Sequence, residues 1–140
     1  ECATTIASGL RYGSFCRAII TVPGERIFRH GDETSALYVV ASGSLQLLLP
    51  QGSQPYSGAR ALINYTRGDL VGSSSCCFRS PALCDGFSAT YAELIEIGLG
   101  FVEELTSQFP DFLKCIEQAA KHEANLLRGI IRCEDKKFIF

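Results

Sequence analysis

The feature that most constrains the fold is a series of short β-rich segments, separated by turns that contain glycine. The β-rich segments lie at 26–29, 36–41, 45–49, 60–65 and 87–97. The turns are Pro23-Gly24, His30-Gly31-Asp32, Ser42-Gly43-Ser44 and Arg67-Gly68-Asp69. Short strands at near-regular spacing, closed by glycine turns, are typical of antiparallel barrels and sandwiches. We therefore predict a mainly β domain at 23–99, an antiparallel β-roll or jelly-roll barrel of about eight strands.

Helical patterns flank this β-rich region. In the preceding segment, 1–22, apolar residues recur at a loosely helical spacing: Ile6, Leu10, Phe15 and Ile19. We therefore predict an N-terminal helical segment there. From Gly100 onward, apolar residues recur at steps of three and four residues, which predicts C-terminal helices over 100–133. Pro110 is expected to divide a short helix from a longer one, and 134–140 is predicted to be an extended tail.

Composition excludes several classes of protein. The 140 residues carry a formal net charge of -2, which is not the basic footprint of a nucleic-acid-binding domain. No apolar run approaches the ~20 residues of a membrane span, so contact with a membrane would come through other segments of a parent protein. The seven cysteines lack the regular spacing of a disulfide framework, and adjacent Cys76-Cys77 does not fit common zinc-ligand spacings. We expect reduced thiols in a cytosolic setting and no metal site.

Five stretches, in this order, resemble parts of cyclic-nucleotide-binding domains. They lie at 23–32, 36–45, 68–72, 90–94 and 109–112. In turn they resemble the opening hairpin, the next pair of strands, the entry to the phosphate-binding cassette, the strand after it and the start of the last helix. Placed on this chain, the cassette spans 68–90. Within this family, Ala36-Leu37-Tyr38 and Thr90-Tyr91 are most similar to ether-à-go-go and hyperpolarisation-activated ion channels.

The resemblance implies a non-enzymatic regulatory domain on the cytoplasmic side of a membrane. It would belong to a channel or transporter, and its partners would be the rest of that protein or a neighbouring subunit. The cassette, however, departs from the family pattern of Gly-Glu, apolar residues, and then Arg followed by Thr or Ala. Gly72 is kept, but Ser73 stands at the Glu position, Ala82 at the Arg position and Leu83 beside it. The candidate pocket residues are Val71, Gly72, Ser73, Ser74, Ser75, Ala82 and Leu83.

A cyclic nucleotide offers an anionic phosphate and a ribose hydroxyl, for which Arg and Glu are suited binding partners. Because both are missing, we expect no obligatory cofactor and weak or no binding of cAMP or cGMP. One alternative is a functional cAMP or cGMP sensor that uses backbone amides and the cassette serines. A second is that Arg79 reaches into the pocket in place of the missing arginine, although a solvated Arg79 side chain is favoured over this arrangement.

In ether-à-go-go-type channels, a C-terminal strand fills the pocket. Phe138 and Phe140 are the candidates for such an intrinsic plug here, and a frayed terminus is the alternative. We find no set of residues that would support an enzyme.

Overall fold

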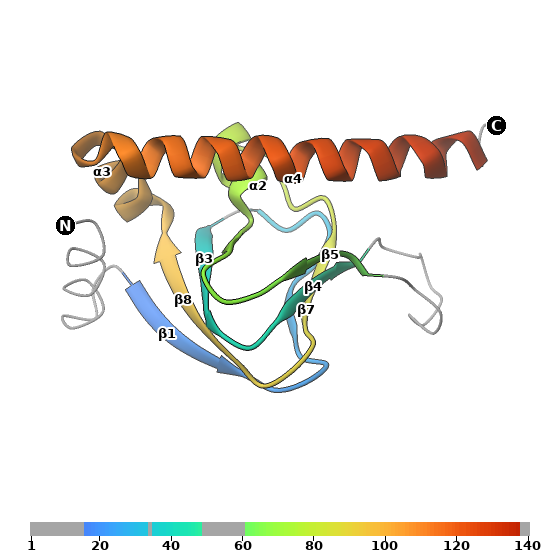
Figure 1. Cartoon of the computed structure of the whole chain (residues 1–140), viewed down its shortest axis with the longest axis horizontal. Helices are drawn as coiled ribbons and strands as arrows, with labels where there is room; N and C mark the ends of the chain where they lie inside the picture. The colour runs from blue at the N-terminus through green and yellow to red at the C-terminus, as the bar shows by residue number, and fades with distance from the viewer. Residues whose placement is uncertain (1–15, 34, 49–60, 138–140) are drawn as a thin grey trace.

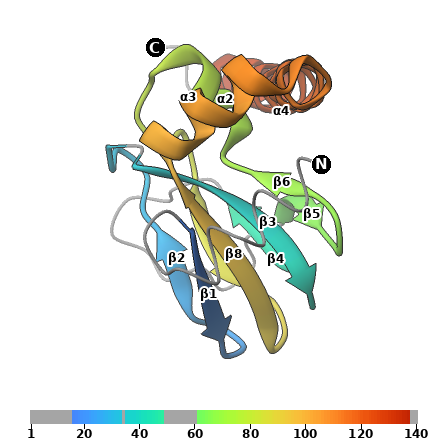
Figure 2. The same ribbon diagram turned by 90° about the vertical axis from the view of Figure 1, so that its left-hand side faces the viewer.

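The structure is a computed structural model that describes residues 16–33, 35–48 and 61–137, with side chains from Ile63 to Leu127 in the last range. In these residues, eight strands form two antiparallel four-stranded sheets. One sheet has the order β1 (Cys16–Thr21), β8 (Ala92–Gly98), β3 (Ala36–Ser42) and β6 (Leu70–Val71). The other has the order β2 (Arg26–Phe28), β7 (Asp85–Ser88), β4 (Leu45–Leu48) and β5 (Ala61–Tyr65). The sheets form a β-roll with the helices gathered at one end (Figures 1 and 2), which confirms the predicted fold class.

The first strand corrects the sequence prediction. Segment 1–22 was expected to be helical, but Cys16–Thr21 is a strand that pairs with β8, from Cys16 opposite Ile97 to Thr21 opposite Ala92. Three consecutive β-branched residues, Ile19 to Thr21, favour an extended backbone, and this local preference outweighs the loose helical spacing. Residues 1–15 lie outside the described part of the chain.

Pro110 divides the C-terminal helices as predicted. Helix α3 (Leu99–Gln108) ends at Phe109, whose backbone is extended with φ -126° and ψ 93°. Helix α4 (Pro110–Lys137) then begins at the proline, a position where the missing N–H is not needed. Asp111 in its first turn interacts favourably with the helix dipole. The prediction of an extended tail at 134–140 is wrong for its first four residues, because α4 continues to Lys137.

The cassette contains one further helix, α2 (Ser73–Phe78), which packs against α4 at the helical end of the β-roll (Figures 1 and 2). Two glycine-type conformations bound the helix: Gly72 before it has φ 84° and Arg79 after it has φ 53°. Glycine adopts such a positive φ without a steric penalty, whereas arginine does so only at some cost. The cassette backbone therefore turns sharply on both sides of a short, fixed helix.

Two apolar clusters hold the structure together. The first fills the β-roll and includes Val40, Leu45 and Leu94. The second lies between the β1-containing sheet and the helices, and includes Leu37, Ile97, Phe101, Leu105 and Ile116. The helices are therefore packed on the β-roll through a buried apolar interface. Within the described ranges, no helix combines the length and hydropathy required to cross a bilayer.

Candidate functional site

A hollow of about 180 Å³ lies where the cassette meets β2 and β3. Its lining residues are Ile27, Phe28, Asp32, Glu33, Ser35, Ala36, Tyr38, Gly72, Ser75 and Ala82. Backbone hydrogen bonds fix the mouth of this hollow. The Ala82 N–H donates to the Asp32 carbonyl at 3.0 Å, and the Gly31 N–H donates to the Ala82 carbonyl at 2.7 Å. One wall is apolar, from Ile27 and Phe28, and the other presents hydroxyls and carboxylates.

The charge of the hollow is negative. Asp32 and Glu33 are both exposed and line it, while none of its described lining residues is a lysine or an arginine. One Asp32 oxygen accepts a hydrogen bond of 3.0 Å from the Arg29 backbone N–H, which orients this carboxylate within the turn. An anionic ligand would therefore meet two carboxylates and no cationic side chain from these residues.

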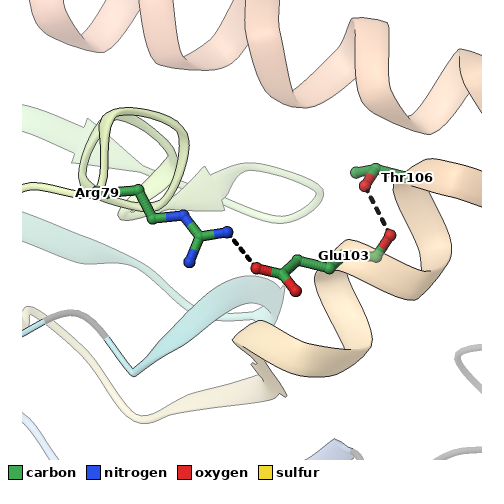
Figure 3. Close-up of polar contacts among 3 residues, drawn as sticks. All are labelled: Arg79, Glu103 and Thr106. Atoms are coloured by element: carbon green, nitrogen blue, oxygen red, sulfur yellow. Dashed lines mark hydrogen bonds and ion pairs between the residues drawn. The ribbon is translucent and has the colours of Figure 1, made fainter.

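Arg79 forms an ion pair with Glu103 on α3 (Figure 3). Both side chains are largely exposed, and the Glu103 carbonyl also accepts a hydrogen bond of 2.9 Å from the Thr106 hydroxyl. Arg79 lines a separate groove between α2, α3 and α4, together with Glu103, and is not among the residues that line the 180 Å³ hollow. The structure thus directs the exposed Arg79 side chain toward Glu103 of α3.

The structure distributes the candidate pocket residues over three environments. Gly72, Ser75 and Ala82 line the hollow. Ser74 and Leu83 line a much smaller cavity of about 20 Å³, which shares Phe28, Gly72 and Ser75 with the hollow. Val71 lies fully buried in the core of the β-roll. Ser73 is also fully buried, and its hydroxyl has no hydrogen-bond partner among the described residues. Phe138 and Phe140 lie outside the described residues.

Sequence reasoning missed one residue beside the cassette, Glu123 of α4. Its side chain is only 4% exposed, and it lines the small cavity with Ser74. A signal was present, since Glu123 interrupts the buried stripe of α4 formed by Ile116, Ala120 and Leu127. An acidic residue on the apolar face of a helix must find donors in the folded protein. Those donors come from distant parts of the chain and are described below.

The cysteines of this region are free and mostly buried. Burial is the main cause that raises the pKa of Cys76 and of Cys84 to about 11. Burial also raises the pKa of Tyr65 well above its ordinary value, and the neighbouring Glu123 carboxylate raises it further. These groups are therefore held neutral at physiological pH. Cys76 and Cys84 are therefore thiols and not thiolates, and the thiolate is the nucleophilic and metal-binding form of cysteine.

These raised pKa values predict alkaline destabilisation. In the unfolded state the thiols lose their protons near pH 8.5, whereas in the folded state they do so only near pH 11. The free energy of unfolding is therefore unaffected by these thiols below about pH 8.5. It decreases as the pH rises from there through about 11. Urea unfolding under reducing conditions at pH 7 to 11 measures this loss. Cys84→Ala should make the decline shallower, while the matched variant of exposed Cys115, Cys115→Ala, should not. Equal slopes in both variants would contradict the assignment.

Comparisons with known proteins agree with this geometry. The family model for the cyclic nucleotide-binding domain matches residues 21–109. Patatin-like phospholipase domain-containing protein 6 of Mus musculus is 27% identical over 88 residues, which are 62% of this chain and 6% of that protein. The chain therefore spans only a small part of the curated relative that it matches.

Solved structures share this fold. The catabolite activator protein of Thermus thermophilus superposes with a TM-score of 0.67 at 23% identity, over 92% of this chain and 59% of that one. The C-linker/CNBHD of zELK channels, crystallised in the presence of cAMP, superposes with a TM-score of 0.57 at 25% identity, over 77% of this chain and 52% of that one. The chain belongs to the cyclic nucleotide-binding domain family.

Proposed function

We propose that this domain is a non-enzymatic regulatory module whose cassette binds cyclic nucleotides weakly or not at all. The observation that carries the proposal is the charge of the hollow, in which Asp32 and Glu33 stand without a lysine or arginine among the described lining residues. Charge-assisted hydrogen bonds contribute ~1.5–3 kcal/mol each. The loss of two or three of them weakens binding by roughly three orders of magnitude, since ~1.4 kcal/mol is tenfold.

The size of the hollow supports the same proposal. Its volume of about 180 Å³ is below the ~300–1,000 Å³ of typical small-molecule pockets. A cyclic nucleotide would have to displace part of the wall formed by Phe28 and Tyr38, whose rings stack with centroids 6.4 Å apart. Such a displacement adds a cost to binding that an already open pocket would not carry.

Two kinds of parent protein are candidates for this domain. The similarity to the zELK channel domain supports a channel or transporter, with this domain on the cytoplasmic side of the membrane and in contact with the parent protein or a neighbouring subunit. The similarity to a patatin-like phospholipase domain-containing protein favours a second candidate, a regulatory module within a lipid hydrolase. Flanking sequence distinguishes them: several apolar spans of ~20 residues indicate the channel, and a hydrolase domain indicates the second candidate.

One alternative function has an observation in its favour. Gly72 and Ser75 both line the hollow, and Gly72 lets a ligand approach the backbone closely. A cAMP or cGMP sensor could use these groups in place of the missing arginine. The two carboxylates make this the weaker candidate, because they oppose the phosphate charge.

Calorimetric titration of the domain with cAMP and with cGMP tests the proposal. We expect no saturable heat below about 1 mM of either ligand, in line with the lost charge-assisted contacts. A dissociation constant in the low micromolar range for either nucleotide would instead establish the sensor. The same titration in the presence of 1 M salt checks that any weak heat is not a nonspecific ionic effect.

A further inference from the structure

Glu123 brings three separate elements together through one buried carboxylate. One of its oxygens accepts a hydrogen bond from the Tyr65 hydroxyl of β5 at 2.5 Å. The other accepts from the Ser74 hydroxyl of α2, and the Ser74 backbone N–H lies 3.4 Å from the same oxygen. Glu123, Ser74 and Tyr65 are 4%, 3% and 7% exposed. The contact therefore lies inside the protein and is shielded from water.

Among the described side chains, the Glu123 carboxylate is contacted by hydrogen-bond donors and by no cation. Within the part of the chain that the structure describes, the ion pairs are Arg17–Glu96 and Arg79–Glu103, and Glu123 is in neither. A buried carboxylate depends strongly on each hydrogen-bond donor that it keeps. The loss of any one of these donors should therefore weaken the remaining hydrogen bonds to Glu123.

The Ser74 donors lie beside the hollow, in the small cavity that shares Phe28, Gly72 and Ser75 with it. Ser74 is the second residue of α2, so its N–H has no acceptor within the helix. Its hydroxyl is one of the three cassette serines that the sequence offers for anion binding. Both donors face a carboxylate of α4, and one donor cannot serve two anions at the same time.

We propose that Glu123 is an internal anion that holds α4 against the cassette and keeps the Ser74 donors from an external phosphate. The proposal goes beyond the weak nucleotide binding inferred above and supplies a second cause for it. An anion that displaced Glu123 would release α4, and a movement of α4 would free Ser74. The two events are linked, so each must favour the other.

Amide hydrogen exchange measures the attachment of α4 to the cassette. In Glu123→Gln the amide group of the glutamine presents a donor to one of the two hydroxyls, so one charge-assisted bond is lost. We expect exchange in α2 and in the adjoining turns of α4 to accelerate about tenfold or more, while the β3–β8 pairing stays protected. Glu117→Gln is the matched control, because it makes the same change of charge at an exposed position on the same helix. Unchanged exchange in α2 of Glu123→Gln would overturn the proposal.

Ser74→Ala tests the same contact from the cassette side and is the milder substitution if Glu123→Gln fails to fold. We expect it to accelerate exchange in the facing turns of α4, although Ser74 itself is in α2. In the double variant the two effects should not multiply, because both remove one interaction. Independent, multiplying effects would mean that the two residues act separately and would refute the internal anion.

Titration with cAMP tests the exclusion of phosphate. We expect the affinity of Glu123→Gln to be about tenfold or more above that of the unaltered protein and of Glu117→Gln. Faster exchange without any gain in affinity would keep the attachment of α4 but overturn the exclusion. Micromolar binding by the unaltered protein would refute the proposed weak binding and the exclusion, while the exchange measurements would still decide the attachment. The failures of the two proposals are thus distinguishable.

Discussion

Ala82→Arg is expected to give the cassette measurable affinity for cAMP and cGMP. Ala82 lines the hollow, and its backbone is held on both sides by hydrogen bonds to the turn at Gly31 and Asp32. An arginine at this position would supply the planar, cationic donor set that suits phosphate oxygens. One charge-assisted hydrogen bond contributes ~1.5–3 kcal/mol, so the dissociation constant should fall by roughly ten- to a hundredfold. Calorimetric titration of the variant against the unaltered domain gives this ratio directly.

Two further variants make the result specific. Ala82→Gln adds a long polar side chain without charge and is expected to leave the affinity close to that of the unaltered domain. Glu33 lines the same hollow, so Glu33→Gln combined with Ala82→Arg removes a carboxylate that would compete with phosphate for the new arginine. The combined variant should bind more tightly than Ala82→Arg alone. Equal affinities for the arginine and glutamine variants would show that position 82 does not face a bound phosphate.

Gly43→Ala is expected to destabilise the domain by more than ~2 kcal/mol. Gly43 lies in the turn between β3 and β4 with φ 82°, a conformation that costs an L-residue ~1–2 kcal/mol. In addition, an added Cβ would lie 2.3 Å from the Tyr91 carbonyl oxygen and 2.7 Å from the Ala92 Cα. Both are backbone atoms, so relief of the clash requires the hairpin and the start of β8 to separate. Urea unfolding followed by circular dichroism measures the loss.

Gly24→Ala is the matched control for this prediction. Gly24 has nearly the same backbone angle, φ 84°, but an added Cβ there would meet no atom within 4 Å. Gly24→Ala should therefore lose only the conformational part of the free energy of unfolding. The difference in this free energy between the two variants then isolates the steric contact with Tyr91 and Ala92. Losses of equal size would contradict a close approach of the two hairpins at Gly43.

Much of the β-roll could be predicted because its signals are local. The glycine turns at Gly43 and Gly68 both have positive φ, and the β-rich segments between such turns are strands. Pro110 divides two helices for an equally local reason. The prediction failed where local signals conflict, as at Cys16–Thr21, where pairing with a strand more than 70 residues away decides the conformation. Likewise α4 continues past residue 133, the predicted end of the C-terminal helices, to Lys137.

The candidate site was less predictable because its decisive contacts are distant in sequence. That Ala82 stands where the family resemblance implies an arginine could be proposed from the sequence alone. The role of Glu123 could not, because its donors Ser74 and Tyr65 lie 49 and 58 positions away. Nor could the sequence separate the three serines, of which Ser73 is buried without a partner, Ser74 contacts α4 and Ser75 lines the hollow. Residue types suggested candidate binding groups in the cassette, whereas the fold places those groups in different environments.

The length of α4 gives the Phe109–Pro110 junction a mechanical role. With 28 residues at ~1.5 Å each, the helix is roughly 42 Å long and runs across the whole width of the molecule (Figure 1). A rotation of about 10° at Pro110 would displace its far end by roughly 7 Å and the Glu123 position by roughly half of that. In such a rotation α4 would act as a lever that turns at Pro110 and is attached to the cassette near its middle, at Glu123. A displacement of the helix at Glu123 would be roughly doubled at Lys137.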